Sequence, residues 1–130
     1  YYPKSKQRDV GLGAIEKEEC ITSGTAVMGH VRWATTGAPT LRNAHPIERH
    51  EHAIVMNGVI TNYKELVYKE ENWVSDTDAE RLLLHWLSGE SWDEVKGDFA
   101  CVISTGHSLV AYCRNYPSNI SCFRWAHDSL

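Results

Sequence analysis

One segment of this chain, residues 77–87, has the repeat of an amphipathic helix, and the apolar residues on either side of it fall in short runs. Thr77 and Glu80 have the spacing of a capping box at a helix start, and Gly89 follows as a stop signal. The apolar side chains of the segment recur at helical intervals: Ala79, Leu82, Leu83, Trp86 and Leu87. A helix inserted among strands, without regular β–α alternation, predicts an α+β fold with a mainly antiparallel sheet.

Strand-forming composition marks the runs around this helix. β-Branched and aromatic residues predict strands at residues 25–33, 53–60, 99–105 and 108–114, with a further strand near 120–126. Asn57-Gly58 is expected to break the second of these strands. Residues 36–52 are predicted as a turn-rich polar segment, and residues 61–69 as a short mixed segment that opens one or two helical turns.

The cysteine pattern bears on the compartment. Four cysteines are present: Cys20, Cys101, Cys113 and Cys122. None has the C-x-x-C spacing of a zinc or redox site. A hairpin that turns at Gly106-His107 places Cys101 opposite Tyr112 and directs Cys113 to the other face of the sheet, so no disulfide is expected between them. Reduced thiols indicate a reducing compartment, and the expected location is cytoplasmic.

The length of 130 residues and the charge of the chain restrict the class of protein. We expect residues 1–130 to form a single domain, with residues 1–24 as a loop or irregular lead-in. A net charge of −4 argues against a nucleic-acid partner, and no membrane partner is expected because no apolar run approaches ~18 residues. The chain begins Tyr1-Tyr2-Pro3 rather than with methionine and ends after an apolar and aromatic stretch, so we expect a domain that is incomplete at both ends.

Arg32 stands at the end of a predicted strand and is followed by hydroxyl side chains and a glycine. Its planar guanidinium suits a small carboxylate, with Thr35 and Thr36 as neutral donors. The alternative, a strand-end arginine paired with a surface acid, stays open on these residues alone.

Two further motifs have both a structural and a functional interpretation. Asn57-Gly58 is a common two-residue hairpin signal, but an Asn amide and a Gly N–H also make an oxyanion site. Asp78 lies at the start of the predicted helix. An acid there either stabilises the positive N-terminal end of the helix or, in a cleft, holds a ligand's ammonium group.

Three histidines lie close together in the sequence, His45, His50 and His52, with Glu48 and Glu51 nearby. The segment lacks periodicity, and no second ligand group has metal-site spacing. No glycine-rich nucleotide loop appears in the chain either. Neither a metal nor a cofactor is therefore expected.

Five short blocks extend in order across most of the chain. They are GHVRWAT at 29–35, NAHP at 43–46, MNGVITNY at 56–63, SDTDAE at 75–80 and GDFA at 97–100. Together they resemble the class II glutamine amidotransferases of the N-terminal nucleophile hydrolases, in particular the glutaminase domains of glucosamine-6-phosphate synthase and amidophosphoribosyltransferase. The resemblance implies a four-layer α/β/β/α sandwich that hydrolyses glutamine to glutamate and ammonia.

The resemblance also implies which residues bind glutamine. Arg32 would bind the α-carboxylate, and Trp33 and Thr35 would shape that pocket. Asp78, with the carbonyl of Gly58, would hold the α-ammonium. One cation, one acid and neutral donors are the groups that a zwitterionic amide needs.

Catalysis in this family depends on an oxyanion hole and on a cysteine at the mature N-terminus, whose own amine is the general base. The resemblance assigns the oxyanion hole to Asn57 and Gly58, whereas every cysteine of the printed chain is internal. Three explanations are open: an N-terminal segment outside this sequence, a chain completed by another, or a non-catalytic module that binds glutamine or a protein partner. L-Glutamine is the expected ligand, and the expected partner of an active enzyme is an ammonia-accepting synthase domain or subunit.

Overall fold

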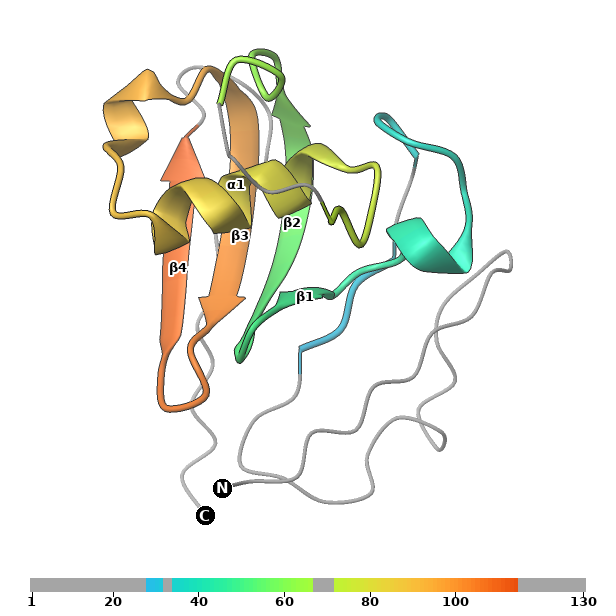
Figure 1. Ribbon diagram of the computed structural model, residues 1–130, viewed down its shortest axis with the longest axis horizontal. Helices are drawn as coiled ribbons and strands as arrows, with labels where there is room; N and C mark the ends of the chain where they lie inside the picture. The colour runs from blue at the N-terminus through green and yellow to red at the C-terminus, as the bar shows by residue number, and fades with distance from the viewer. Residues whose placement is uncertain (1–27, 32–33, 67–71, 115–130) are drawn as a thin grey trace.

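The computed structural model describes residues 28–31, 34–66 and 72–114 (Figure 1). In chain order the elements are η1 (Leu41–Asn43), β1 (Ile47–Arg49), β2 (His52–Ile60), α1 (Asp78–Leu87), η2 (Trp92–Glu94), β3 (Gly97–Ser104) and β4 (Leu109–Arg114). The strands form one antiparallel sheet in the order β1-β2-β3-β4, and α1 lies across one face of it (Figure 1). The predicted α+β class with an antiparallel sheet is confirmed. Of the four layers expected, the described residues form a helix layer and a sheet layer.

The core lies between α1 and the sheet. Alternate residues of β2 and β3 face the helix, because side chains along a strand point to opposite faces in turn. The residues that are buried there are Ile54, Met56 and Ile60 of β2, Phe99, Cys101 and Ile103 of β3, and Ala79, Leu82 and Leu83 of α1. This packing holds the start of α1 against β2, and that placement matters for the site.

Helix α1 begins where the sequence predicts, with Thr77 as N-cap and Asp78 as the first helical residue. The capping box itself does not form, since the Thr77 side chain makes no cap hydrogen bond. Glu80 instead turns back to the loop before the helix, where Oε2 accepts from the Ser75 N–H at 2.7 Å. Gly89, at a φ of 73°, follows the C-cap residue and ends the helix as expected.

The strand predictions are confirmed in the C-terminal half and partly wrong before it. The predicted hairpin of strands 99–105 and 108–114 corresponds to β3 and β4, whose register pairs Cys101 with Tyr112 as expected. Residues 28–31, predicted as part of a strand, have no regular secondary structure. The segment predicted as turn-rich, 36–52, contains η1 and the short strand β1, because β1 is stabilised by pairing with β2 rather than by its own composition.

Strand β2 runs without interruption through Asn57-Gly58, so the expected break there is wrong. Gly58 has a φ of 116° and pairs with Phe99 of β3. A Cβ at this position would lie 2.1 Å from the backbone oxygen of Asp98. The glycine is therefore required by the close approach of two strands, not by a hairpin turn.

Several predictions lie outside the described residues or differ in detail. Residues 61–66 form turns, with the Glu65 N–H donating to the Asn62 carbonyl, rather than a helix. The irregular lead-in at 1–24 and the strand near 120–126 lie outside the described residues. Within the described ranges, no helix is long and apolar enough to cross a membrane.

Cys101 and Cys113 are both free thiols, in agreement with the prediction that they do not form a disulfide. Burial in the core raises the pKa of the Cys101 thiol to about 12 from 9.0. The folded state therefore keeps a proton that the unfolded state releases above pH 9.0, so the contribution of Cys101 to stability is present below that pH and is lost as the pH rises toward 12. We expect the free energy of unfolding to fall by about 1.4 kcal/mol per pH unit through this group.

Urea unfolding of the parent and of Cys101→Ala between pH 8 and 10.5 measures this slope. The variant is expected to lose the Cys101 share of the pH dependence, whereas Cys113→Ala, at a half-buried position, should keep it. Equal slopes in the parent and in Cys101→Ala would contradict the assignment.

Candidate functional site

A cavity of about 280 Å³ lies beside β2 and the start of α1. Four of the six predicted site residues line it: Thr35, Asn57, Gly58 and Asp78. They come from three separate parts of the chain, the loop before η1, the middle of β2 and the first turn of α1. The remaining described lining residues are His30, Val31, His45 and Met56. The other two predicted residues, Arg32 and Trp33, lie outside the described residues.

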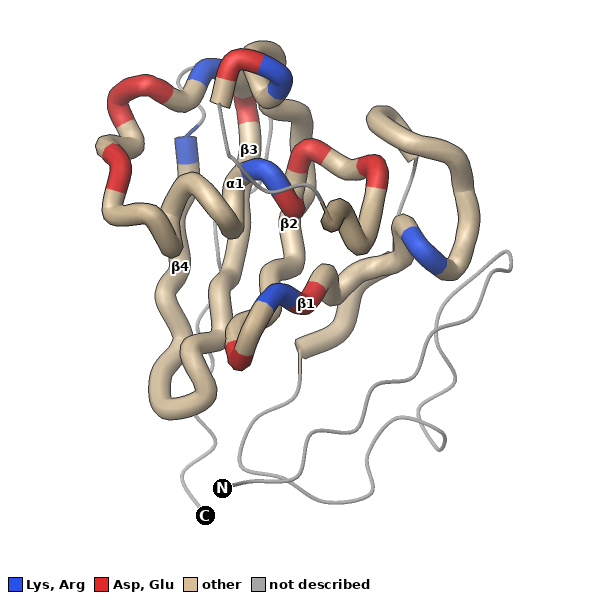
Figure 2. Tube along the Cα trace, viewed as in Figure 1, with Lys and Arg blue, Asp and Glu red and all other residues tan. Residues whose placement is uncertain are grey.

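Asp78 is the charged residue of the described lining, and it lies where acidic residues gather at the start of α1 (Figure 2). Its Oδ2 accepts the backbone N–H of Ile60 at 2.9 Å, and the residue is buried. The carboxylate therefore bonds to β2 rather than only to its own helix, and the positive end of the helix dipole adds to its stabilisation. The interpretation of Asp78 as a helix-end acid alone does not account for this contact with β2.

The edge of β2 beside the cavity is not covered by β1. The pairing with β1 ends at Ile54. Beyond that residue, side chains from outside β2 accept the hydrogen bonds of the β2 backbone N–H groups. Met56 N–H donates to Nδ1 of His45 at 3.2 Å, and Ile60 N–H donates to Asp78. Strand N–H groups alternate between the two edges, so the N–H of Gly58, midway between these two, is expected to point to the same edge.

Asn57 is exposed, and its backbone pairs with Ala100 of β3. Its side chain and the N–H of Gly58 are the two donor groups that the oxyanion interpretation requires. The hairpin alternative for this pair is wrong, because β2 continues through it. Gly58 therefore permits the close approach of β3, and the side-chain amide of Asn57 lies beside it at the cavity.

His45 lines the cavity, although it was not predicted as a site residue. It is buried, its ring centroid lies 4.4 Å from that of His30, and its Nδ1 accepts from the β2 backbone. The ring of His52 instead lies beside that of Trp86, with 5.7 Å between the two ring centroids. Among the residues that the structure describes, no group of three possible ligands is placed to hold a metal ion. The block NAHP at 43–46 was the available signal for His45.

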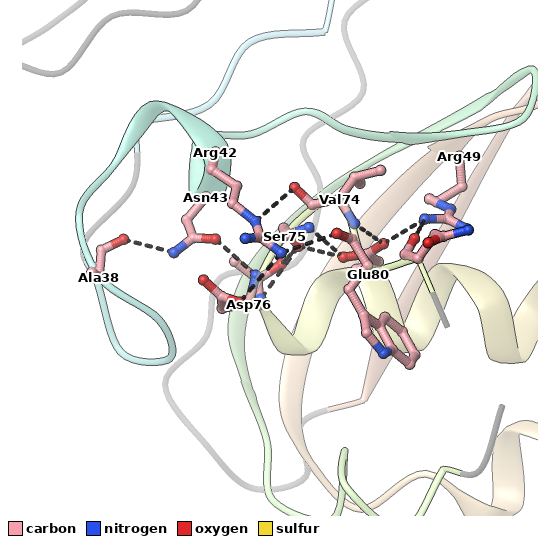
Figure 3. Close-up of polar contacts among 11 residues, drawn as sticks. Ala38, Arg42, Asn43, Arg49, Val74, Ser75, Asp76 and Glu80 are labelled. Carbon is pink, nitrogen blue, oxygen red and sulfur yellow. Dashed lines mark hydrogen bonds and ion pairs between the residues drawn. The ribbon is translucent and has the colours of Figure 1, made fainter. Parts of the chain in front are cut away.

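Buried polar side chains join the loops around the start of α1 (Figure 3). Glu80, which is fully buried, forms an ion pair with Arg49 of β1 at 3.0 Å and accepts from Val74 N–H and Ser75 N–H. Asn43 of η1 accepts from the Asp76 N–H. These contacts fix the backbone immediately before Asp78.

The chain is similar to several known proteins. Residues 13–112 match the family described as the glutamine amidotransferase domain. Among similar proteins, the isomerizing glutamine–fructose-6-phosphate aminotransferase of Chlamydia caviae is 37% identical over 119 residues, which are 77% of this chain and 19% of that protein.

Two further relatives carry the same name. The protein from Listeria innocua is 42% identical over 116 residues, covering 85% of this chain and 19% of its own length. That from Gluconobacter oxydans is 51% identical over 85 residues, covering 61% of this chain and 14% of its own length. The chain thus spans less than a fifth of the length of these relatives.

Proposed function

The chain belongs to the glutamine amidotransferase family, and we propose that its cavity beside β2 binds L-glutamine as one domain of a glutaminase. The observation that carries the proposal is the cavity that gathers Asp78, Asn57 and Gly58 from two elements. Its volume of about 280 Å³ is below the ~300–1,000 Å³ of sites for drug-sized ligands, and it suits a free amino acid.

In the proposed complex, each charged group of glutamine meets a group of opposite charge. Asp78 receives the α-ammonium together with the carbonyl of Gly58. The guanidinium of Arg32 receives the α-carboxylate in two parallel hydrogen bonds, with Trp33 and Thr35 beside it. Support comes from the burial of Asp78 at the cavity and from its anchoring on β2.

The proposed chemistry is that of the family. An N-terminal cysteine thiol, activated by its own amine, adds to the side-chain amide carbon of glutamine. The developing oxyanion is stabilised by the amide of Asn57 and the N–H of Gly58. The carbon–nitrogen bond then breaks, ammonia leaves with a proton from the amine, and water hydrolyses the thioester to give glutamate.

We propose that the ammonia passes to a synthase domain or subunit, since the relatives are named as aminotransferases that use glutamine and fructose 6-phosphate. The proposed fold of the whole domain is the four-layer sandwich. Support for this comes from β2 and β3, where Val55, Val59 and Val102 alternate with the core residues and therefore face away from α1. A second sheet on that face would cover these half-buried valines.

We expect Asp78→Asn to weaken glutamine binding ten- to over a hundredfold, because a charge-assisted hydrogen bond contributes roughly 1.5–3 kcal/mol. The asparagine oxygen still accepts from the Ile60 N–H, so the change removes the charge and keeps the hydrogen bond to β2. Titration calorimetry with glutamine measures the effect, and Asp98→Asn, the same change at an exposed site on β3, is the matched control.

The outcomes separate the alternatives for Asp78. A lower melting temperature with unchanged glutamine affinity would leave Asp78 as a helix-end acid only. No glutamine binding by the parent protein would overturn the proposed ligand.

The activity is tested with the protein in a form whose mature N-terminus is cysteine. This form should release ammonia from glutamine, and the electrophilic analogue diazo-oxo-norleucine should label that cysteine alone. Glutamine binding without ammonia release would indicate a non-catalytic binding module. Labelling of Cys101 would contradict the proposed mechanism, because its thiol is buried and has a raised pKa.

A further inference from the structure

We propose that Asn43 is a positioning residue that holds the loop carrying Thr35 against the start of α1. It would thereby set the distance between the carboxylate-binding and ammonium-binding sides of the glutamine site. The inference rests on the proposed function and extends it. It gives a role to the NAHP block at 43–46, of which the proposed chemistry uses no side chain.

Asn43 bonds to two loops at once (Figure 3). Its Nδ2 donates to the Ala38 carbonyl at 2.9 Å, and its Oδ1 accepts the Asp76 N–H at 2.8 Å. The Asn43 side chain is 0% exposed, so water has little access to its amide, although the backbone groups of Ala38 and Asp76 lie nearer the surface. The side-chain amide thus bridges two backbone segments that are far apart in sequence.

The two segments that Asn43 joins each lead to the cavity. Thr35 lies shortly before Ala38, and Asp78 lies shortly after Asp76, and both line the cavity. The first is the proposed carboxylate side and the second the proposed ammonium side. The bridge therefore fixes one side of the ligand site relative to the other.

The surroundings of Gly37 show that its loop packs closely against Asn43 and Asp76. A Cβ on Gly37 would lie 2.9 Å from Nδ2 of Asn43 and 3.2 Å from the Asp76 carbonyl oxygen. Its φ of 78° is also one that L side chains rarely adopt. A side chain here would push the loop away from Asn43 and Asp76.

A second link between the same segments is weaker. Arg42 donates to the carbonyls of Trp73 and Val74 at 3.0 and 3.2 Å and reaches Asp76 at 3.6 Å, but all three contacts are exposed, and the Arg42 and Asp76 side chains are 52% and 61% exposed. Exposed ion pairs contribute little, since solvent screens them and both side chains lose freedom. The buried amide is therefore the link that determines the spacing, and it needs both a donor and an acceptor, which aspartate does not offer when ionised.

Asn62 provides a matched control. It too is a buried asparagine that joins two backbone groups of a distant segment, donating to the Glu94 carbonyl at 2.9 Å and accepting the Lys96 N–H at 2.8 Å. It does not line the cavity. Its loss should reduce stability in the same way without moving Thr35 relative to Asp78.

The experiment compares Asn43→Asp and Asn43→Ala with Asn62→Asp and Asn62→Ala. Melting temperature and glutamine affinity by calorimetry are measured for each variant and for the parent. All four should melt earlier, but only the Asn43 variants should bind glutamine about tenfold or more weakly, because misplacement of a site group by ~1 Å is costly. In the glutaminase-active form, KM should rise more than kcat falls.

Gly37→Ala tests the same contact from the other side and keeps the test usable if the Asn43 variants do not fold. Gly37 is exposed, so the variant should fold and still bind glutamine more weakly. Parent-like affinity in folded Asn43 and Gly37 variants would overturn the inference, as would an equal loss in the Asn62 variants. Absence of glutamine binding in the parent would instead overturn the proposed function on which the inference rests.

Discussion

Replacement of Asn57 by alanine is expected to lower glutamine turnover by ~10²–10³-fold and to leave KM within a few-fold of the parent value. The reason is that an oxyanion donor acts on charge that develops only in the transition state, so its loss reduces kcat rather than ground-state binding. Rates of ammonia release at varied glutamine concentration, measured on the form with an N-terminal cysteine, give both constants.

The structure indicates that this variant will fold. Asn57 is exposed, and its contribution to the sheet is backbone pairing with Ala100, which alanine retains. Asn72→Ala, at another exposed asparagine that does not line the cavity, serves as the control and should keep parent-like rates. A rise in KM at unchanged kcat would place Asn57 in substrate binding rather than in the oxyanion hole.

Elements defined by local signals were predicted correctly. The helix at 77–87 has its apolar period, its start and its stop within one segment, and α1 is found at Asp78–Leu87. The hairpin of β3 and β4 turns at Gly106, and its register follows from counting back from that turn. Both depend on residues close in sequence, which is the information that a single chain displays.

Features that depend on distant partners were not predicted correctly. Asn57-Gly58 has a strong local turn signal, but pairing of β2 with β3 along the whole strand overrides it. Strand β1 is three residues long and forms because β2 provides its partner. Glu80 fits a capping box in sequence, yet its carboxylate is occupied by Arg49 and the 74–75 backbone.

In the candidate site, too, the sequence pattern indicated the residues but not the long-range contacts that position them. The order of the five blocks indicated Thr35, Asn57, Gly58 and Asp78, and the cavity brings these residues together. The sequence could not show what holds them in place, because the bridging hydrogen bonds join residues 31 to 33 positions apart. A buried polar side chain such as Asn43 looks like a loop residue until its partners are known.

Glu80→Ala is expected to lower the free energy of unfolding by about 3–5 kcal/mol, because it removes one partner of a buried ion pair. Arg49 is 7% exposed and Glu80 0% exposed, so the guanidinium would be left without its carboxylate inside the protein. The N–H groups of Val74 and Ser75 would lose their acceptor as well. Thermal unfolding should shift down by roughly 10–20 °C, whereas the exposed Glu90→Ala should stay within about 0.5 kcal/mol of the parent.

The double variant Arg49→Met with Glu80→Leu removes both charges of the ion pair, together with the hydrogen bond from Arg49 to the Asn72 carbonyl. Replacing both partners by apolar residues removes the unpaired charge, and in many buried pairs this restores stability. Here it should restore only part of the loss, since the buried Ser75 N–H still lacks an acceptor at a cost of about 1–3 kcal/mol, and the part-buried Val74 N–H adds a smaller cost. Full recovery in the double variant would show that Glu80 acts through Arg49 alone. Partial recovery would show that hydrogen bonds to the loop before Asp78 contribute as well, those that Glu80 accepts from Val74 and Ser75 and the one that Arg49 donates to the Asn72 carbonyl.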